Sequence, residues 1–271
     1  MNSGSKTPCW ALVTGASAGI GAAFARELAS RGTSLVLTAR REDRLAVLAA
    51  ELLERHGTHV ECIAADLAEP AAPKKLCAEI ERRGIAIDTL INNAGYGLPG
   101  SFVSQPWPKH AEFIQVMMTA PCELAHLLLK GMQQRGFGRI VNVASLAGLV
   151  PGSAGHTLYG ASKAFLIKFS QSLALENLKH GVNVCAVCPG FTYSEFHDVT
   201  GTRGVVSKMP SWMWLSAEEV ARRGMDAVER GEIVYVTGRI NRMIKTLLKL
   251  LPDRFALRAM QKRAKNFRAQ E

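Results

Sequence analysis

Two residues with acid–base chemistry stand four positions apart in the second half of the chain, Tyr159 and Lys163. On a helix, positions i and i+4 share one face, so the phenol and the ammonium group would lie close together. A free phenol has a pKa of about 10 and exchanges protons poorly at neutral pH. An adjacent ammonium group favours the phenolate and lowers that pKa. The pair therefore predicts a tyrosine that acts as a general acid or base.

Ser145 stands at the end of the apolar segment Arg139–Ala144, which is typical of a buried strand. A hydroxyl group at the carboxyl end of a strand can hydrogen-bond a reacting carbonyl oxygen and hold it against Tyr159. The Tyr-x-x-x-Lys spacing by itself is more often an exposed helix pair than a catalytic one. Other motifs must therefore decide between the two interpretations.

A glycine-rich turn, Val13–Gly21, follows a short apolar run and precedes a helical pattern. Glycines at positions 15, 19 and 21 permit a tight turn and a close approach of the backbone to a phosphate. The N-terminus of the following helix adds free N–H groups and a positive dipole end. The turn predicts a dinucleotide phosphate site, and an ordinary glycine-rich turn is the alternative.

The next expected strand, Ser34–Ala39, is followed by Arg40 and Arg41. Folds that bind NAD usually place an acidic residue here to accept the ribose hydroxyls. Two arginines would instead attract a 2′-phosphate, which favours NADP(H). Two solvated arginines are the alternative, although cationic side chains at a helix N-terminus oppose its dipole.

Together these motifs resemble the short-chain dehydrogenase/reductase family. The glycine turn, Asn92–Gly95, the Tyr159/Lys163 pair and the Pro189-Gly190 turn follow one another in the order of that family, from about Cys9 to Val236. The resemblance implies hydride transfer between a nicotinamide and a carbon that bears oxygen, with Tyr159 as the acid or base.

The resemblance also assigns roles to individual residues. Ser145, Tyr159 and Lys163 are the expected catalytic residues, Asp66 and Leu67 would meet the adenine, and Lys163 would also hold the nicotinamide ribose. The expected cofactor-binding residues are Gly15, Ser17, Gly19, Ile20, Arg40, Arg41, Asp66, Leu67, Asn93, Ala94, Tyr159, Lys163, Pro189, Gly190 and Thr192.

Two features depart from the family pattern. The interval from Ser145 to Tyr159 is one residue longer than is usual, which a loop absorbs. Met117 stands where the family commonly has an asparagine that helps to hold a water between the lysine and solvent, and methionine cannot do so. We expect activity to be retained, because the proton-transfer groups remain. The alternative is a non-catalytic NADP(H)-binding scaffold or sensor.

Apolar, β-branched segments alternate with helical patterns, which predicts a doubly wound, parallel Rossmann-type sheet flanked by helices. We expect one oxidoreductase domain over residues 1–238, including a substrate loop at about 191–215, and a basic helical extension over 239–271. The seven expected strands are Cys9–Thr14, Ser34–Ala39, His59–Ala65, Thr89–Asn92, Arg139–Ala144, Val182–Val187 and Glu232–Val236.

The loops expected beside the nicotinamide are rich in apolar and aromatic residues. They predict a lipophilic ketone or alcohol substrate of the steroid, acyl-chain or aryl-ketone kind. Alternatively, the Trp-rich part packs on the tail or on a second subunit of a homodimer or homotetramer. The residues concerned are Tyr96, Leu98, Phe191, Tyr193, Phe196, Met209, Trp212, Met213 and Trp214.

The composition is that of a globular protein, with 271 residues, 48% of them hydrophobic and 21% charged. No apolar run reaches the roughly 18 residues that span a bilayer, and the N-terminus lacks a signal-peptide pattern. We therefore expect a cytoplasmic protein. The seven histidines lack metal-ligand spacing, so no metal is expected, although His156 could border the substrate. Cys185 and Cys188 would point to opposite faces of one strand.

The tail from Arg239 onward holds ten of the 33 Lys and Arg residues against two acidic residues, a net charge of +8 out of +10. Because the rest is nearly neutral, we expect no nucleic-acid partner. An apolar stripe (Ile240, Ile244, Leu247, Leu248, Leu251) lies opposite basic residues (Arg242, Lys245, Lys249), and Pro252 and Asp253 separate a second helix. The stripe forms a lid or a subunit interface, or it lies in the plane of an anionic membrane.

Overall fold

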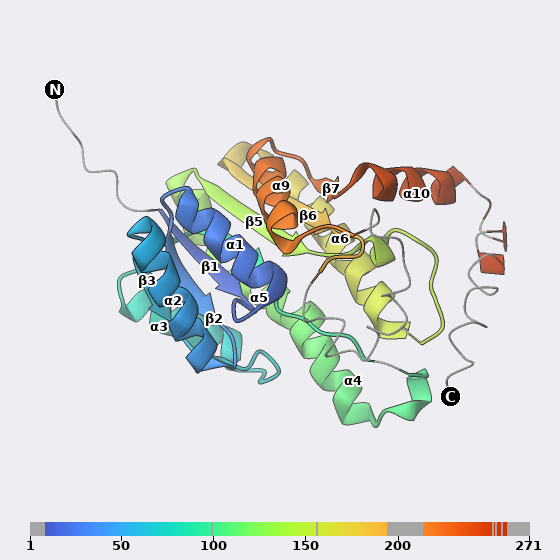
Figure 1. The fold of residues 1–271 in the computed structure, drawn as a ribbon, viewed down its shortest axis with the longest axis horizontal. Coiled ribbons are helices and arrows are strands. Elements are labelled where there is room, and N and C mark those ends of the chain that lie inside the picture. The colour runs from blue at the N-terminus through green and yellow to red at the C-terminus, as the bar shows by residue number, and fades with distance from the viewer. Residues whose placement is uncertain are drawn as a thin grey trace.

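The computed structural model describes residues 9–98, 100–155, 157–193, 214–250, 252, 254–255 and 257–258. In these residues, seven parallel strands form one sheet in the order β3-β2-β1-β4-β5-β6-β7 (Figure 1). The predicted doubly wound Rossmann-type sheet is therefore confirmed. The strands are β1 (Trp10–Thr14), β2 (Ser34–Thr38), β3 (Val60–Cys62), β4 (Ile87–Asn92), β5 (Gly138–Val143), β6 (Val182–Cys188) and β7 (Val234–Val236).

Helices cover both faces of the sheet. One buried cluster joins it to α1 (Gly19–Ser30), α2 (Glu42–His56) and α9 (Ala217–Glu229). A second cluster, on the other face, joins it to α3 (Ala72–Arg82), α5 (Ala120–Arg135) and α6 (Thr157–Asn177). Helix α4 (Trp107–Ile114) continues through a π-helical turn (Gln115–Thr119) into α5, and α10 (Arg239–Leu250) follows β7.

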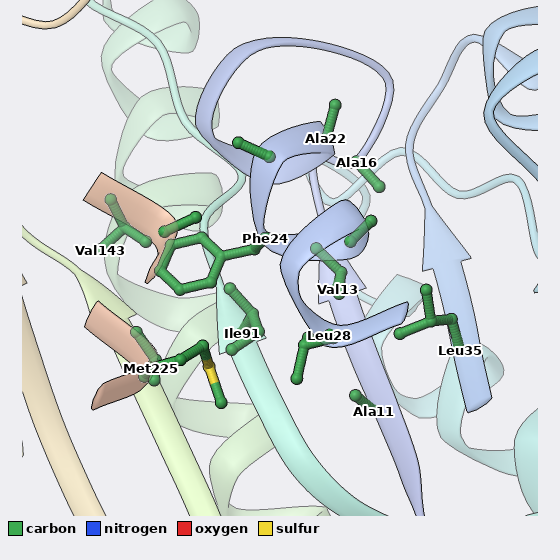
Figure 2. Packing of buried hydrophobic residues seen from close by; sticks show 14 of the residues in the cluster. Ala11, Val13, Ala16, Ala22, Phe24, Leu28, Leu35, Ile91, Val143 and Met225 are labelled. Atoms are coloured by element: carbon green, nitrogen blue, oxygen red, sulfur yellow. The ribbon is translucent and has the colours of Figure 1, made fainter. Parts of the chain in front are cut away.

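Strand β1 shows why two helical layers are needed. All five of its residues are buried, with Ala11 and Val13 in the first cluster and Trp10 and Leu12 in the second. Successive side chains of a strand point to opposite faces, so an unbroken apolar run needs cover on both sides. Figure 2 shows the first cluster, with Phe24 of α1 packed toward the sheet.

The order of the strands places a crevice at their carboxyl ends. Strands β2 and β3 lie on one side of β1, whereas β4 to β7 lie on the other. In open parallel sheets, ligands bind where the order reverses in this way. The turns after β1 and β4 and the loop after β5 therefore meet at one edge of the sheet, and the predicted site residues lie in these segments.

Three predicted strands differ from the structure by more than one residue at an end: β3 and β7 are shorter, with β7 beginning at Val234 and not at Glu232, and β4 is longer. The segment His59–Ala65 contributes only Val60–Cys62 to the sheet, because β3 is an edge strand that pairs with β2 alone. Strand β4 begins at Ile87 and not at Thr89. Cys185 and Cys188 belong to different hydrophobic clusters, as the strand geometry predicts. Among the described helices, none has the length and apolar character needed to span a bilayer.

Candidate active site

The turn between β1 and α1 brings unpaired N–H groups to the sheet edge. Gly15 has a φ of 66°, in the left-handed region that favours glycine. A Cβ on Gly15 would lie 2.8 Å from the Cα of Ala94, and one on Gly21 would lie 2.3 Å from the Gly15 carbonyl oxygen. Ala18 provides no side-chain cap for α1, which leaves donors for an anion. The turn, which also contains Ser17, Gly19 and Ile20, has the space and the donors that a phosphate needs.

Thr14, which the sequence analysis did not identify, ties this turn to β4. Its hydroxyl donates to the Ile91 carbonyl oxygen (3.1 Å) and accepts from the N–H groups of Asn93 (2.9 Å) and Ala94 (3.0 Å). The Asn93 amide donates to the carbonyl oxygens of Thr14 (2.9 Å) and Gly15 (3.3 Å). Asn93 and Ala94 therefore lie beside the glycine turn, and the Asn93 side chain holds the turn in place.

The two arginines after β2 lie exposed at the same edge. The Arg41 guanidinium donates to Ser17 Oγ from Nη2 (3.0 Å) and Nε (3.3 Å), which brings it to the glycine turn. The structure thus joins two predicted cofactor residues that are 24 positions apart. Arg40 lies at the end of the same strand, where a group beside the turn would meet both positive charges.

Asp66 and Leu67 lie beside the end of β2, because the Ala65 N–H donates to the Ala39 carbonyl oxygen (3.1 Å). The Asp66 carboxylate accepts from the N–H of Ala68 (3.0 Å), and Leu67 is buried. The Asp66 carboxylate therefore stabilises its own loop, and the side chain remains exposed at the crevice.

The catalytic pair predicted from the sequence lies in the first turns of α6. Lys163 is buried, and its Nζ donates to the carbonyl oxygen of Val143 in β5 (2.7 Å). The same Nζ lies 5.7 Å from the centre of the Tyr159 ring. Ser145 Oγ accepts from the N–H of Ala147 (3.1 Å), and its side chain hydrogen-bonds that of Tyr159. The structure brings the three residues together.

Desolvation dominates the electrostatics of the pair. Burial raises the pKa of Tyr159, and the hydrogen bond with Ser145 opposes that effect only in part. Burial also lowers the pKa of Lys163 to about 8, and its ammonium group donates to the Val143 carbonyl. The expectation that this ammonium group, together with an oxidised nicotinamide, favours the phenolate stays a prediction. The phenol keeps its proton at neutral pH, which suits a proton donor.

The turn after β6 closes the catalytic side. The carbonyl oxygen of Pro189 accepts from the N–H of Leu146 (2.8 Å), next to Ser145. Thr192 is buried and donates to the Gly190 carbonyl oxygen (3.2 Å). A Cβ on Gly190 would lie 2.4 Å from Nδ2 of Asn241, the buried residue of α10. The sequence did not predict this contact between the tail and the predicted cofactor turn.

Beside Tyr159, the structure contains a small pocket that opens to solvent. Three of its side chains are apolar, whereas several others carry hydrogen-bonding groups that the sequence analysis did not identify. The pocket is lined by Leu98, Gly100, Ser101, Phe102, Gln105, His110, Thr157, Leu158 and Tyr159. The pocket therefore includes a polar surface from α4 and the loop before it, and the apolar loop predicted at about 191–215 lies mostly outside the described residues.

The described aromatic residues that were predicted to line the substrate site are not among the residues that line this pocket. Tyr96 packs edge-on against Phe113, with ring centres 5.5 Å apart. Tyr193 stacks on Trp214 at 4.6 Å and stays 57% exposed. Phe191 also contacts Trp214. Phe196, Met209, Trp212 and Met213, like His156, lie outside the described residues.

Met117 lies in the π-helical turn and is buried. A Cβ on Gly95 would lie 2.7 Å from its Sδ, so the thioether packs directly on the Asn-Asn-Ala-Gly segment. An apolar group fills the position at which the family commonly has an amide. The prediction that a water relay through this position is altered remains open.

A buried polar chain supports the catalytic side from behind. Asn92 Nδ2 donates to Asn142 Oδ1 (2.9 Å) and to the carbonyl oxygen of Pro121 (3.2 Å). Asn142 Nδ2 donates to Ser170 Oγ (2.8 Å), and Ser170 donates to the Leu166 carbonyl oxygen (2.7 Å). The chain links β4, β5, α5 and α6, and so fixes the strand that carries Val143 against the helix that carries Lys163. No cluster of three or more potential metal ligands occurs among the described residues.

Comparisons with known proteins agree with this geometry. The family model described as short chain dehydrogenase matches residues 9–202. Nodulation protein G of Rhizobium sp. (strain N33) is 36% identical over 84% of this chain and 92% of its own length. The very-long-chain 3-oxoacyl-CoA reductase of Anas platyrhynchos is 35% identical over 70% of this chain and 62% of its own. A short-chain dehydrogenase from Sphingobium yanoikuyae, solved in complex with NADPH, superposes with a TM-score of 0.79 at 34% identity, covering 90% and 96% of the two chains.

Proposed function

This chain belongs to the short-chain dehydrogenase family, and from that premise we propose that it uses NADP(H) to interconvert a lipophilic ketone or aldehyde and its alcohol. The observation that carries the proposal is the grouping of Ser145, Tyr159 and buried Lys163 beside an open pocket. A carbonyl oxygen between the two hydroxyls would accept hydrogen bonds from both. Tyr159 then supplies the proton to that oxygen.

The chain offers a fitting site for NADP(H). A side chain at Gly15 or Gly21 would collide with Ala94, Asn93 or the Gly15 carbonyl, so these glycines let the turn pack tightly against β4 beside the N-terminus of α1. Arg40 and Arg41 would hold a 2′-phosphate by charge-assisted hydrogen bonds. The remaining contacts would come from Ser17, Gly19, Ile20, Asp66, Leu67, Asn93, Ala94, Tyr159, Lys163, Pro189, Gly190 and Thr192. When bound, the cofactor supplies or accepts the hydride, as the family's chemistry requires.

The cofactor preference has a direct test. Arg40→Ala should weaken NADPH binding by about 1.5–3 kcal/mol and leave NADH binding nearly unchanged, because only NADPH carries the 2′-phosphate. Arg55→Ala, at the far end of α2 where the side chain pairs with Glu51, is the matched control. Equal losses for both cofactors in a fluorescence titration would show that Arg40 does not bind the phosphate.

Two observations support a lipophilic substrate. Leu98, Phe102 and Leu158 provide apolar pocket surface, and a relative at 35% identity acts on very-long-chain 3-oxoacyl-CoA. The test is NADPH oxidation with a panel of acyl-chain, steroid and aryl ketones. Tyr159→Phe should abolish turnover while NADPH binding persists, and Tyr235→Phe in strand β7 should not change the rate.

The second candidate is a protein that binds NADP(H) without turnover, and the apolar Met117 favours it. The same panel separates the two functions. NADPH binding with no turnover of any ketone, unaffected by Tyr159→Phe, would support the scaffold or sensor. Turnover that depends on Tyr159 supports the enzyme.

We further propose a cytoplasmic location with peripheral contact to anionic membrane through α10. This helix has four basic residues and no acidic one (Arg239, Arg242, Lys245, Lys249). Met243, Leu247 and Leu250 are 57%, 55% and 77% exposed, so the described part of the chain does not cover them. The residues of the predicted apolar stripe differ in exposure: Ile240, Ile244 and Leu248 are half-buried, whereas Leu247 is exposed. Leu251 and Asp253 lie outside the described residues.

Vesicle sedimentation tests the membrane contact. The protein should bind anionic but not neutral liposomes, with binding weakened by salt. Leu247→Gln should reduce binding, whereas Leu175→Gln, which is 61% exposed on α6, should not. Protein that stays in the supernatant at low salt would leave α10 as a lid or a subunit contact. Light scattering would then decide between the expected homodimer and homotetramer.

A further inference from the structure

One buried polar residue of the tail has no role in the chemistry proposed so far. Of the 12 residues of α10, which the structure describes in full, only Asn241 is buried, with 3% of its surface exposed. Its neighbours Arg242 and Met243 are exposed, and Figure 1 shows α10 extending from β7 past the sheet. A buried amide needs hydrogen-bond partners, so the contacts of Asn241 show what this helix rests on.

The backbone that precedes α10 fixes the Asn241 amide. Its Nδ2 donates to the carbonyl oxygen of Thr237 (2.8 Å), and because a carbonyl oxygen only accepts, this bond determines which end of the amide carries the nitrogen. The N–H of Thr237 in turn donates to the carbonyl oxygen of Cys188 (3.3 Å), the last residue of β6. The amide is therefore held at the strand end from which the Pro189-Gly190 turn begins.

The same amide lies directly against Gly190. A Cβ on Gly190 would lie 2.4 Å from Nδ2 and 2.6 Å from Oδ1 of Asn241. The amide could not move aside without losing the bond to Thr237, which would leave a buried donor unpaired. Gly190 therefore leaves the space that the Asn241 amide occupies.

These contacts hold the turn from two sides. From the catalytic side, the N–H of Leu146, next to Ser145, donates to the carbonyl oxygen of Pro189 (2.8 Å). From the tail, Asn241 packs on Gly190. Placement of such a turn matters, because a shift of about 1 Å in a positioning element can cost about 100-fold in rate.

We propose that Asn241 is a positioning residue that fixes the Pro189-Gly190 turn where it meets the nicotinamide half of NADP(H), so that the tail helix completes the cofactor site. The inference rests on the proposed function, because it takes this turn as part of that site. The adenosine half would be held by the glycine turn after β1 and by the arginines after β2, and β4 and β5 separate β1 from β6. The tail therefore supports one half of the cofactor.

The test compares two ligands in fluorescence or calorimetric titrations of the full-length protein. Adenosine 2′,5′-bisphosphate has the adenine and the 2′-phosphate of NADPH but no nicotinamide. Asn241→Ala should weaken NADPH binding by about 5–20-fold and bisphosphate binding by less than about twofold. Thr246→Ala is the matched control, because this exposed residue of α10 donates to the Arg242 carbonyl oxygen (2.9 Å) in the same i to i−4 pattern. It should change neither affinity.

A pair of variants tests the contact itself. Gly190→Ala places a Cβ against the Asn241 amide and should weaken NADPH binding by at least about 10-fold. Adding Asn241→Ala removes the amide, so the double variant should bind NADPH at least about threefold more tightly than Gly190→Ala alone. Independent effects would instead add to a greater loss. The comparison of two ligands in Asn241→Ala does not require that Gly190→Ala folds.

These measurements separate the inference from the proposed function, because binding does not require turnover. A loss for NADPH alone in Asn241→Ala supports the inference even if no ketone is reduced. Equal losses for the two ligands, an unchanged NADPH affinity, or additive losses in the double variant overturn the inference and leave the proposed function intact. A wild type that does not bind NADPH overturns both.

Discussion

The two sides of the pocket differ in how their polar groups are held. On the catalytic side, the Lys163 ammonium group donates to the backbone of β5, and the Ser145 hydroxyl accepts from Ala147. On the opposite side, the loop and α4 leave Val103 87% and Trp107 64% exposed. The catalytic side is a buried framework, and the other side is an exposed surface.

We infer from this difference that the catalytic side carries out proton transfer, whereas the exposed side determines which substrates bind. Proton transfer requires groups fixed within a small fraction of an ångström, and hydrogen bonds to a sheet provide that rigidity. Recognition of a substrate requires groups whose hydrogen bonds are completed only when the ligand arrives. Substitutions on the two sides should therefore have different effects on stability, on rate and on selectivity.

The largest expected effect is that of Lys163→Met. It should lower kcat/KM by at least about 100-fold, because the ammonium group that serves Tyr159 is lost. It should also stabilise the fold by about 1–3 kcal/mol at pH 7, since burial holds the pKa of Lys163 at about 8 and not 10.5. The unpaired Val143 carbonyl offsets part of the gain.

The sign of this stability change is tested by pH. Below about pH 8 the buried ammonium group destabilises the folded protein in full. Between about pH 8 and 10.5 only the unfolded chain keeps the proton, so the wild type gains stability relative to the variant. Chemical denaturation across that range measures the difference, with the exposed Lys168→Met on the same helix as the control. A variant less stable than the wild type at pH 7 would contradict the argument.

The next effect is that of Asn142→Ala in the framework. This change leaves the Asn92 amide and the Ser170 hydroxyl without one partner each in the core, and should cost about 2–4 kcal/mol. Gln105→Ala, in the pocket loop, should change stability by less than about 0.5 kcal/mol. Urea unfolding measures the free energy of unfolding of both variants. Similar losses in the two would contradict the proposed difference between the two sides of the pocket.

A smaller effect is expected for Met117→Asn. The asparagine amide would be buried against Gly95 without a partner, so stability should fall by about 1–3 kcal/mol with little gain in rate. Thermal melts and ketone reduction measure the two quantities, with the half-buried Met118→Asn as the control. A large rate increase at an unchanged melting temperature would show that relay of protons to solvent limits the enzyme.

The smallest effect is expected at the open side. Val103→Ser should change the free energy of unfolding by less than about 0.5 kcal/mol and leave the reduction of simple ketones unchanged, because Val103 is 87% exposed. Denaturation and steady-state kinetics check both. A tenfold loss of activity would show that this loop closes over the substrate.

Much of the fold could be predicted from the sequence, because the patterns that indicate strands, turns and helices are local. The apolar runs predicted all seven strands. Edge strands β3 and β7 are shorter than predicted, β4 begins two residues earlier, and the other ends differ by at most one residue. The glycine turn and the Tyr159/Lys163 spacing identified their segments for the same reason. Each depends on residues within a few positions of one another, whose backbone geometry local sterics dictate.

The tertiary structure decided which distant groups meet. The contact of Lys163 with the Val143 carbonyl, the Thr14 bridge to β4, and the contact between Asn241 and Gly190 join residues 20 or more positions apart. Burial also raises the pKa of Tyr159. The pocket beside Tyr159 carries no local signal, since residues from separate segments of the chain line it. Desolvation and long-range contacts arise only when the chain is packed, so a pattern in the sequence cannot encode them in advance.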